Sequence, residues 1–306
     1  MRKIVASLLI ISICFAFTII DSNSSTYAIL NLPPVEWEMN CKRNGDFQIN
    51  ASIETPFQEY YFCGTNKINL DEKQIIVCKT DLTGKEIWNK SIKISKKAIG
   101  VNIHLNPNNT LTVIGNYISE DTGKWSVCVI NLTRDGKIMW EKSIGSDKHQ
   151  YVYKSILTID HTFVLVGYSE TKEKQSMYIT NVSLQGEIIW EKVYGEAHNL
   201  IGKDCVQLYD ENFLFIGESI SDKGVLNVAI YKTDPYGVKI WEKIYLSEDS
   251  YAANNIIIAN DNGYLILGET DAYTENIGIY LMKIDETGKK QWEKFYDNSS
   301  SSGGKS

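Results

Sequence analysis

The octapeptide Asp81-Leu-Thr-Gly-Lys-Glu-Ile-Trp88 has four relatives further along the chain, and this repetition decides the fold. Each copy ends in a tryptophan and carries a glycine four residues earlier. Six tryptophans recur at intervals of 50–52 residues, and the seventh, Trp125, is out of phase. The periodic residues are Trp37, Trp88, Trp140, Trp190, Trp241 and Trp292, with Gly84, Gly136, Gly186, Gly237 and Gly288. A period of this length indicates a repeat architecture.

A second glycine marks each repeat, at the end of an apolar run 23–25 residues before the tryptophan. Each repeat divides into four short segments rich in Ile, Val, Tyr and Phe, which is typical of β-strands. In the third repeat they span 153–160, 163–168, 177–182 and 187–194. The second glycines are Gly64, Gly115, Gly167, Gly217 and Gly268. This pattern predicts an all-β protein, a β-propeller of five full four-stranded blades plus one orphan N-terminal strand around Trp37.

The octapeptide has the composition of a tight turn followed by a strand. Its glycine is expected to take a positive φ in a hairpin turn between the third and fourth strands, where the leading Asp or Ser accepts hydrogen bonds from the turn amides. The tryptophan then lies on the outermost strand of its sheet and presents a large flat surface to the neighbouring sheet. We therefore expect the periodic tryptophans to be structural residues that connect successive blades.

The arrangement of Asp, Thr, Gly and Trp in 81–88 and 285–292 resembles the tryptophan-docking repeat of quinoprotein-type β-propellers. The continuation Trp-Glu-Lys-x-Tyr resembles repeats of exported bacterial and archaeal propeller proteins. The resemblance covers residues 35–298 and implies the fold. A quinoprotein enzyme would imply a pyrroloquinoline quinone cofactor held by an adjacent-cysteine disulfide and calcium ligands. The chain has no adjacent cysteine pair and fewer blades than that family, so no cofactor is predicted.

The two ends of the repeat array leave its closure open. A leading strand such as the one around Trp37 commonly completes the last blade of a propeller, but Trp292 already supplies a fourth strand to the fifth repeat. One interpretation is an incomplete six-blade ring, and the other is a compact five-blade ring with the Trp37 strand added at its edge. An open arc would leave unpaired backbone groups along its end strands.

The N-terminal segment differs from the repeats. Arg2 and Lys3 precede an apolar run over 4–20, and small polar residues follow, as in a secretory signal. We expect a signal peptide at 1–28, a propeller at 29–298, and a disordered tail or truncated start of a further repeat at 299–306. The alternative is an uncleaved anchor, through which the protein would contact a membrane. The expected location is extracytoplasmic, either secreted or at the cell surface.

Charge and cysteine content bear on the class of partner. The formal net charge is −7 and no basic stripe is present, so a nucleic-acid partner is not expected. The cysteines after the signal form no CxxC motif or Cys/His cluster, so no metal is predicted. Most lie in apolar runs and are expected to be small buried hydrophobes, with one disulfide as the alternative. They are Cys41, Cys63, Cys78, Cys128 and Cys205.

The loops that join strands 2 and 3, and those that join successive repeats, are expected on one face, and their sequences are diverse. Trp125 ends one such loop, as a ligand contact or a packing residue. His149 and His198 occupy similar positions in consecutive repeats, although no third metal ligand is evident. The acidic residues of this region are interpreted as a solvated rim and are Asp147, Glu196, Glu248 and Asp249.

No catalytic motif stands out, since the chain lacks a nucleophile elbow, an HExxH motif and a phosphate-binding loop. The sequence therefore favours a non-enzymatic module that binds or scaffolds an unknown protein or glycan through its variable-loop face. One alternative is a propeller-type enzyme, quinoprotein-like or lyase- or glycosidase-like, for which the first strands offer His104, Asp160 and Asp204. Another is a truncated repeat protein without independent activity.

Overall fold

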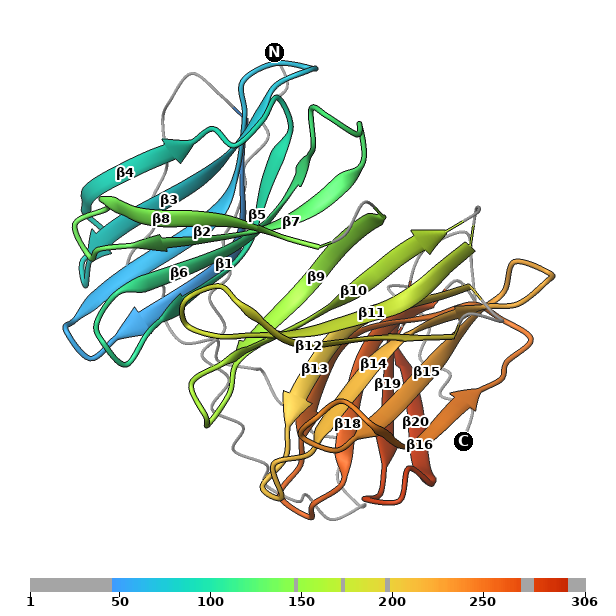
Figure 1. Ribbon diagram of the computed structural model, residues 1–306. Helices are drawn as coiled ribbons and strands as arrows, with labels where there is room; N and C mark the ends of the chain where they lie inside the picture. Colours follow the sequence, from blue (N-terminus) through green and yellow to red (C-terminus); the bar gives the residue numbers. More distant parts are fainter. Residues whose placement is uncertain (1–45, 146–147, 172–173, 196–198, 271–277, 297–306) are drawn as a thin grey trace. The chain divides into compact units, whose positions relative to one another are not determined.

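The computed structural model describes residues 46–145, 148–171, 174–195, 199–270 and 278–296. These residues form twenty β-strands, arranged as five four-stranded antiparallel sheets whose strands follow one another in sequence order (Figure 1). We call each sheet a blade. The described residues include no helix that is long and apolar enough to span a membrane.

The first two blades comprise β1 (Asp46–Thr55), β2 (Glu59–Lys67), β3 (Lys73–Asp81), β4 (Glu86–Ile92), β5 (Ala98–Leu105), β6 (Leu111–Ile118), β7 (Trp125–Leu132) and β8 (Ile138–Ile144). The third and fourth comprise β9 (His149–Leu157), β10 (Phe163–Thr171), β11 (Lys174–Val182), β12 (Ile188–Tyr194), β13 (Asn199–Gln207), β14 (Phe213–Ile220), β15 (Leu226–Thr233) and β16 (Lys239–Tyr245). The fifth comprises β17 (Tyr251–Ile258), β18 (Tyr264–Thr270), β19 (Gly278–Ile284) and β20 (Lys290–Tyr296).

The all-β class and the four strands per repeat are confirmed, whereas several strand bounds differ from the prediction. In the third repeat, β9 begins at His149 instead of residue 153, and the β10–β11 hairpin continues through 169–171 and 174–176. These added residues are mostly polar, so apolar content alone did not mark them as strand. Residues 35–39, which carry the predicted orphan strand, lie outside the described residues.

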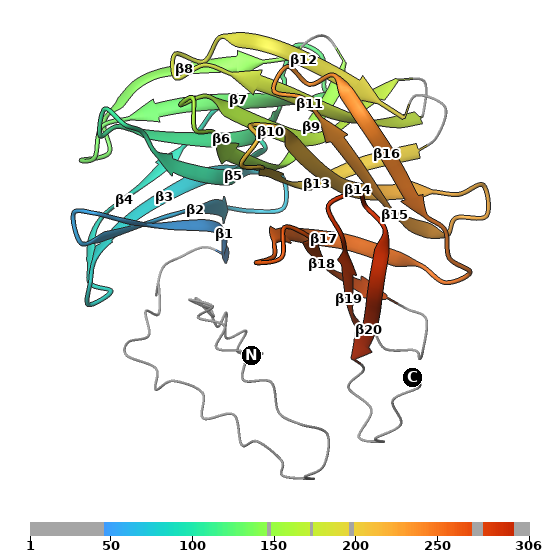
Figure 2. The same ribbon diagram turned by 90° about the horizontal axis from the view of Figure 1, so that it is seen from below.

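The first strand of each blade packs on the preceding blade. β5 contacts β1, β2 and β3, and the same relation holds for β9, β13 and β17 against the three inner strands of their preceding blades. The five first strands β1, β5, β9, β13 and β17 lie innermost, and the fourth strands lie outermost (Figure 2). Residues on the first strands of different blades are therefore brought together, although they are about fifty positions apart in sequence.

Four hydrophobic cores separate the five blades, one at each successive interface. Because neighbouring residues of a strand point to opposite faces, a central strand contributes to two cores. Val113 of β6 faces the first blade and Ile114 faces the third. The predicted small buried cysteines fit this scheme, since the side chains of Cys63, Cys78 and Cys128 are buried.

The octapeptide turns have the predicted geometry. All five glycines take a positive φ between +74° and +83°. In the first turn, the Asp81 carboxylate accepts hydrogen bonds from the backbone N–H groups of Thr83 and Lys85, at 2.9 and 3.0 Å. Asp234, Asp285 and Ser183 accept equivalent bonds in their own turns.

The periodic tryptophans dock on these turns. A Cβ atom placed on Gly186 would lie 2.8 Å from the ring of Trp140, the tryptophan of the preceding blade. The indole of Trp88 also donates a hydrogen bond to the carbonyl of Arg134, at 3.2 Å. Among the described residues, the docked pairs are Trp88–Gly136, Trp140–Gly186, Trp190–Gly237 and Trp241–Gly288. The glycine is thus needed twice, for its φ and for the space that the indole occupies.

Candidate functional site

Each innermost strand carries one extra residue that pairs with nothing on the neighbouring second strand. This β-bulge lies at the same place in every blade, and a bulge re-aims the extra side chain out of the regular alternation. The five bulge residues are Asn50, Val101, Tyr153, Lys203 and Asn254.

The second glycine of each repeat makes room for the bulge. A Cβ atom on Gly167 would lie 1.9 Å from the carbonyl oxygen of Tyr151, two residues before the bulge residue Tyr153. A Cβ atom on Gly268 would lie 1.8 Å from the carbonyl oxygen of Ala252. In all five repeats this glycine follows the bulge residue by fourteen positions. The glycine that ends each apolar run is therefore required because the backbone of the first strand lies too close for a side chain.

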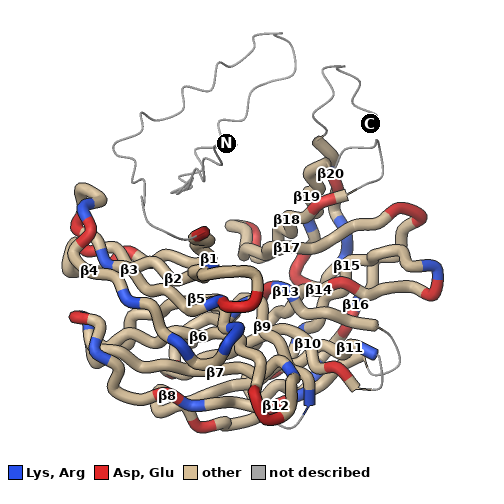
Figure 3. Tube along the Cα trace, turned by 90° about the horizontal axis from the view of Figure 1, so that it is seen from above, with Lys and Arg blue, Asp and Glu red and all other residues tan. Residues whose placement is uncertain are grey.

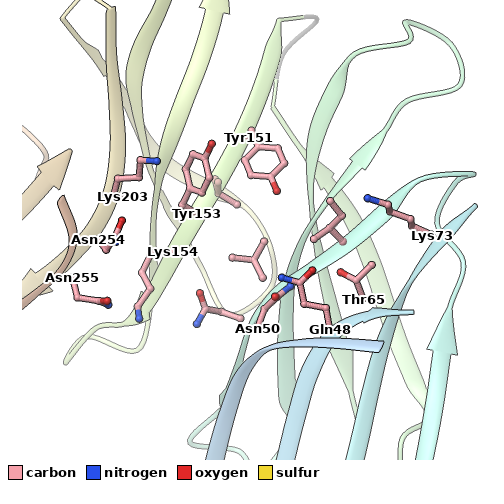
Figure 4. A pocket seen from close by; sticks show the side chains of 14 residues that line it. Gln48, Asn50, Thr65, Lys73, Tyr151, Tyr153, Lys154, Lys203, Asn254 and Asn255 are labelled. Atoms are coloured by element: carbon pink, nitrogen blue, oxygen red, sulfur yellow. The ribbon is translucent and has the colours of Figure 1, made fainter. Parts of the chain in front are cut away.

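The bulges open on a cavity of about 390 Å³ at the centre of the described blades. All five bulge residues line it, together with side chains from β1, β2, β3, β5, β9 and β17 (Figure 4). The polar and aromatic side chains of the lining are Gln48, Asn50, Thr65, Lys73, Asn102, Tyr151, Tyr153, Lys154, Lys203, Asn254 and Asn255. Amides, phenols and ammonium groups thus converge there from all five blades.

Two buried carboxylates, those of Glu218 and Asp204, lie next to lysines of this lining. Lys203 pairs with Glu218 at 3.1 Å, and its ammonium also lies 4.6 Å from the centre of the Tyr153 ring. Lys154 lies 3.9 Å from Asp204. Burial raises the pKa of Asp204. Lys154 and nearby backbone N–H groups favour the ionised carboxylate and act in the opposite direction, but the effect of burial is larger.

The Asp204 carboxylate also connects blades four and five, because it accepts a hydrogen bond from the backbone N–H of Ile256 at 3.0 Å. At the matching position of blade two, Asn102 accepts a bond from the N–H of Ser155 at 3.0 Å. Since an amide fills the same position, the role of Asp204 in blade packing does not need a charge.

An aromatic cluster adjoins the cavity. Tyr151 stacks on Tyr168 with ring centres 5.8 Å apart, and it contacts Tyr153 at 5.0 Å and Trp125 edge-on at 5.3 Å. His149 lies 5.9 Å from Tyr168. We call these five residues the aromatic cluster. Tyr153 is 39% exposed, and burial among the rings raises its pKa to about 12, so its hydroxyl stays protonated.

The structure brings together two of the three predicted binding residues. Trp125 and His149 belong to the aromatic cluster, whereas His198 lies outside the described residues. His149 approaches Glu170 at 3.9 Å. In the described ranges no group of three or more His, Cys, Asp or Glu side chains could hold a metal ion.

The remaining candidates from the first strands and the acidic rim do not gather at the cavity. His104 is half-buried and bonds to the Ser155 hydroxyl at 2.8 Å, and desolvation lowers its pKa to about 4. Asp160 lies exposed in the turn after β9. Glu248 and Asp249 are exposed, while Asp147 and Glu196 lie outside the described residues.

Sequence reasoning missed all of the residues that line the cavity, among them Tyr153 and Lys203. Hydrophobic periodicity assumes regular alternation, and a bulge breaks it. The signal that could have found them is the constant spacing to the second glycine. Counting fourteen residues back from Gly167 and Gly217 gives Tyr153 and Lys203.

No family model and no curated protein sequence matches the chain. Solved structures with a similar fold include an exo-β-1,3-galactanase from Phanerochaete chrysosporium with β-1,3-galactotriose, at 12% identity and a TM-score of 0.51. That match covers 80% of this chain and 61% of the galactanase. A puromycin hydrolase matches at 10% identity and a TM-score of 0.52, over 80% of this chain and 37% of its own. A protein of unknown function from Dyadobacter fermentans matches at 10% identity and a TM-score of 0.53, covering 80% and 81%.

These likenesses establish the fold, and they correct the functional prediction. Two of the three proteins are enzymes by name, so this fold accommodates catalysis. The prediction of a non-enzymatic binding or scaffolding module is wrong, and the propeller-type enzyme is the alternative that the comparisons support. The candidate cavity takes its side chains from five repeats, so no local sequence motif marks it.

Proposed function

We propose that this protein is a glycan-active enzyme that binds and cleaves its substrate in the central cavity. The observation that carries the proposal is the convergence of the five bulge residues on one cavity beside an aromatic cluster. Bulges are over-represented next to active sites, where they re-aim side chains. In this protein every blade has such a bulge on its first strand, and every bulge needs a glycine on the neighbouring strand.

The composition of the cavity suits a sugar. Amide groups such as Asn50 and Asn254 can donate to and accept from hydroxyl groups, and Tyr153 offers both a ring face and a protonated hydroxyl. Amphipathic rings provide a large contact area with one polar end. The galactanase of similar fold was solved with an oligosaccharide, which adds support for a glycan.

Tyr153→Ala is expected to lower kcat/KM by about 10- to 100-fold, because a lost aromatic contact costs about 1.5–3 kcal/mol. The measurement is product release from a panel of oligosaccharides, followed by kinetics on the glycan that is cleaved. Tyr209→Ala is the matched control, since Tyr209 is 91% exposed and does not line the cavity. Equal activity of both variants, or no cleavage of any glycan, would contradict the proposal.

The proposal extends to the context of the enzyme. We propose five full four-stranded blades plus one orphan N-terminal strand around Trp37, as an incomplete six-blade ring, with repeats of the tryptophan-docking type. We also propose export to an extracytoplasmic location, where the substrate would be an extracellular glycan. Cell fractionation tests the location, and light scattering of the mature protein tests whether the array is a monomer.

A further inference from the structure

We infer that the substrate carries negative charge, and that Lys73, Lys154 and Lys203 bind its anionic groups in the central cavity. This inference rests on the proposed function and names the class of glycan: an acidic oligosaccharide that carries carboxylates or sulfates.

The charge of the cavity lining is opposite to that of the chain. The protein has a net charge of −7, and its acidic and basic residues are interspersed over the blades (Figure 3). Yet three lysines and no Asp or Glu belong to the described lining of the cavity. The lysines come from β3, β9 and β13, so three separate blades contribute to this concentration of positive charge.

The lysines are incompletely neutralised by the protein itself. Among the described residues, no carboxylate lies within ion-pair distance of Lys73, whose ammonium points toward the cavity in Figure 4. The separation of 3.9 Å between Lys154 and Asp204 is too long for a hydrogen bond. Asp204 is also engaged by the N–H groups of Ile256 and Cys205.

Lys203 has a close partner in Glu218 and remains available to a ligand. A lysine ammonium has three donors. Glu218 takes one at 3.1 Å, and the ring of Tyr153 lies on another side at 4.6 Å. A ligand anion beside Tyr153 would therefore contact the Lys203 ammonium, which Glu218 already holds in position. Charge-assisted hydrogen bonds of this kind are about twice as strong as neutral ones.

The test compares acidic trimers with a neutral methyl ester. The probes are trigalacturonate, its fully methyl-esterified form and a sulfated galactan trimer, with affinity measured by calorimetry at low and high salt. We expect an acidic trimer to bind at least about tenfold more tightly than the methyl ester, and this preference to shrink as salt screens it. The two acidic probes distinguish a carboxylate from a sulfate.

The variants assign the effect to the cavity. Lys73→Met is expected to weaken acidic binding by about tenfold and to leave the methyl ester unchanged. The double variant Lys203→Met/Glu218→Gln removes both charges of the pair and so leaves no buried carboxylate unpaired; we expect a similar loss. Lys137→Met is the control, because Lys137 is exposed in the turn before β8. Thermal melting confirms that each variant folds.

The outcomes separate the inference from the function on which it rests. If the methyl ester or another neutral trimer binds as tightly as the acidic ones, and Tyr153→Ala weakens it, the inference fails and the proposed function stands. If Lys73→Met and Lys137→Met behave alike toward an acidic trimer, the inference also fails. If no trimer, charged or neutral, binds or is cleaved, both fail together.

Discussion

Trp190→Ala is expected to lower the free energy of unfolding by about 3 kcal/mol, near the lower end for truncating a tryptophan in a packed interface. The indole of Trp190 fills the space beneath Gly237 of the next blade, where a Cβ atom would lie 2.8 Å from the ring. Its removal leaves a cavity at the interface between blades three and four. Urea unfolding, followed by tryptophan fluorescence and circular dichroism, measures the loss.

Trp292 provides the control for this experiment within the same chain. It occupies the same repeat position on β20, is 41% exposed, and has no docking glycine among the described residues. Trp292→Ala is therefore expected to cost less than about 1 kcal/mol. Equal losses for the two variants would show that the indole stabilises its own blade and does not connect it to the next.

Gly167→Ala is expected to cost about 3 kcal/mol or more, or to prevent folding, since the added Cβ atom would lie 1.9 Å from the Tyr151 carbonyl oxygen. The φ of Gly167 is not positive, so this cost comes from the collision alone. Because Tyr151 and the bulge residue Tyr153 line the cavity, any relaxation moves both. Loss of activity at temperatures where the variant is still folded would follow from that movement.

Gly123→Ala is the comparison for this variant. Gly123 has a φ of +68°, and no atom lies within 4 Å of the position of an added Cβ. Its replacement is expected to cost about 1 kcal/mol through backbone strain and to leave activity unchanged. A Gly167→Ala protein as stable and active as Gly123→Ala would show that the β9 bulge is not held by this glycine.

The repeat itself could be predicted from the sequence because its determinants are local. The glycine turn needs Gly at one position and Asp, Ser or Thr at another, and the indole docks on the same turn one repeat later. Asp81, Gly136 and Trp88 therefore recur at fixed spacing and can be recognised by alignment of the chain with itself.

The cavity could not be predicted in the same way. Asn50, Val101, Tyr153, Lys203 and Asn254 occupy equivalent positions but share no chemistry, because each contributes a different group to one site. A self-alignment treats such a position as variable surface. The sequence signal is the constant spacing of fourteen residues to the second glycine, which leaves room for the bulge.

Functional reasoning from motifs failed for a related reason. Trp125 and His149 stand out in the sequence, and both belong to the aromatic cluster. The two tyrosines of this cluster that line the cavity, Tyr151 and Tyr153, lie in a strand-like run and carry no such sequence signal. The prediction of a non-enzymatic module rests on the lack of a recognised catalytic motif.

The most direct test of the central claim is a crystal structure of the protein with the oligosaccharide that it cleaves or binds most tightly. The account predicts sugar density between β9 and β13, in contact with the Tyr153 ring and within hydrogen-bond distance of Lys203. Density on the outer strands or on the loops alone, with the central cavity holding no sugar, would contradict it.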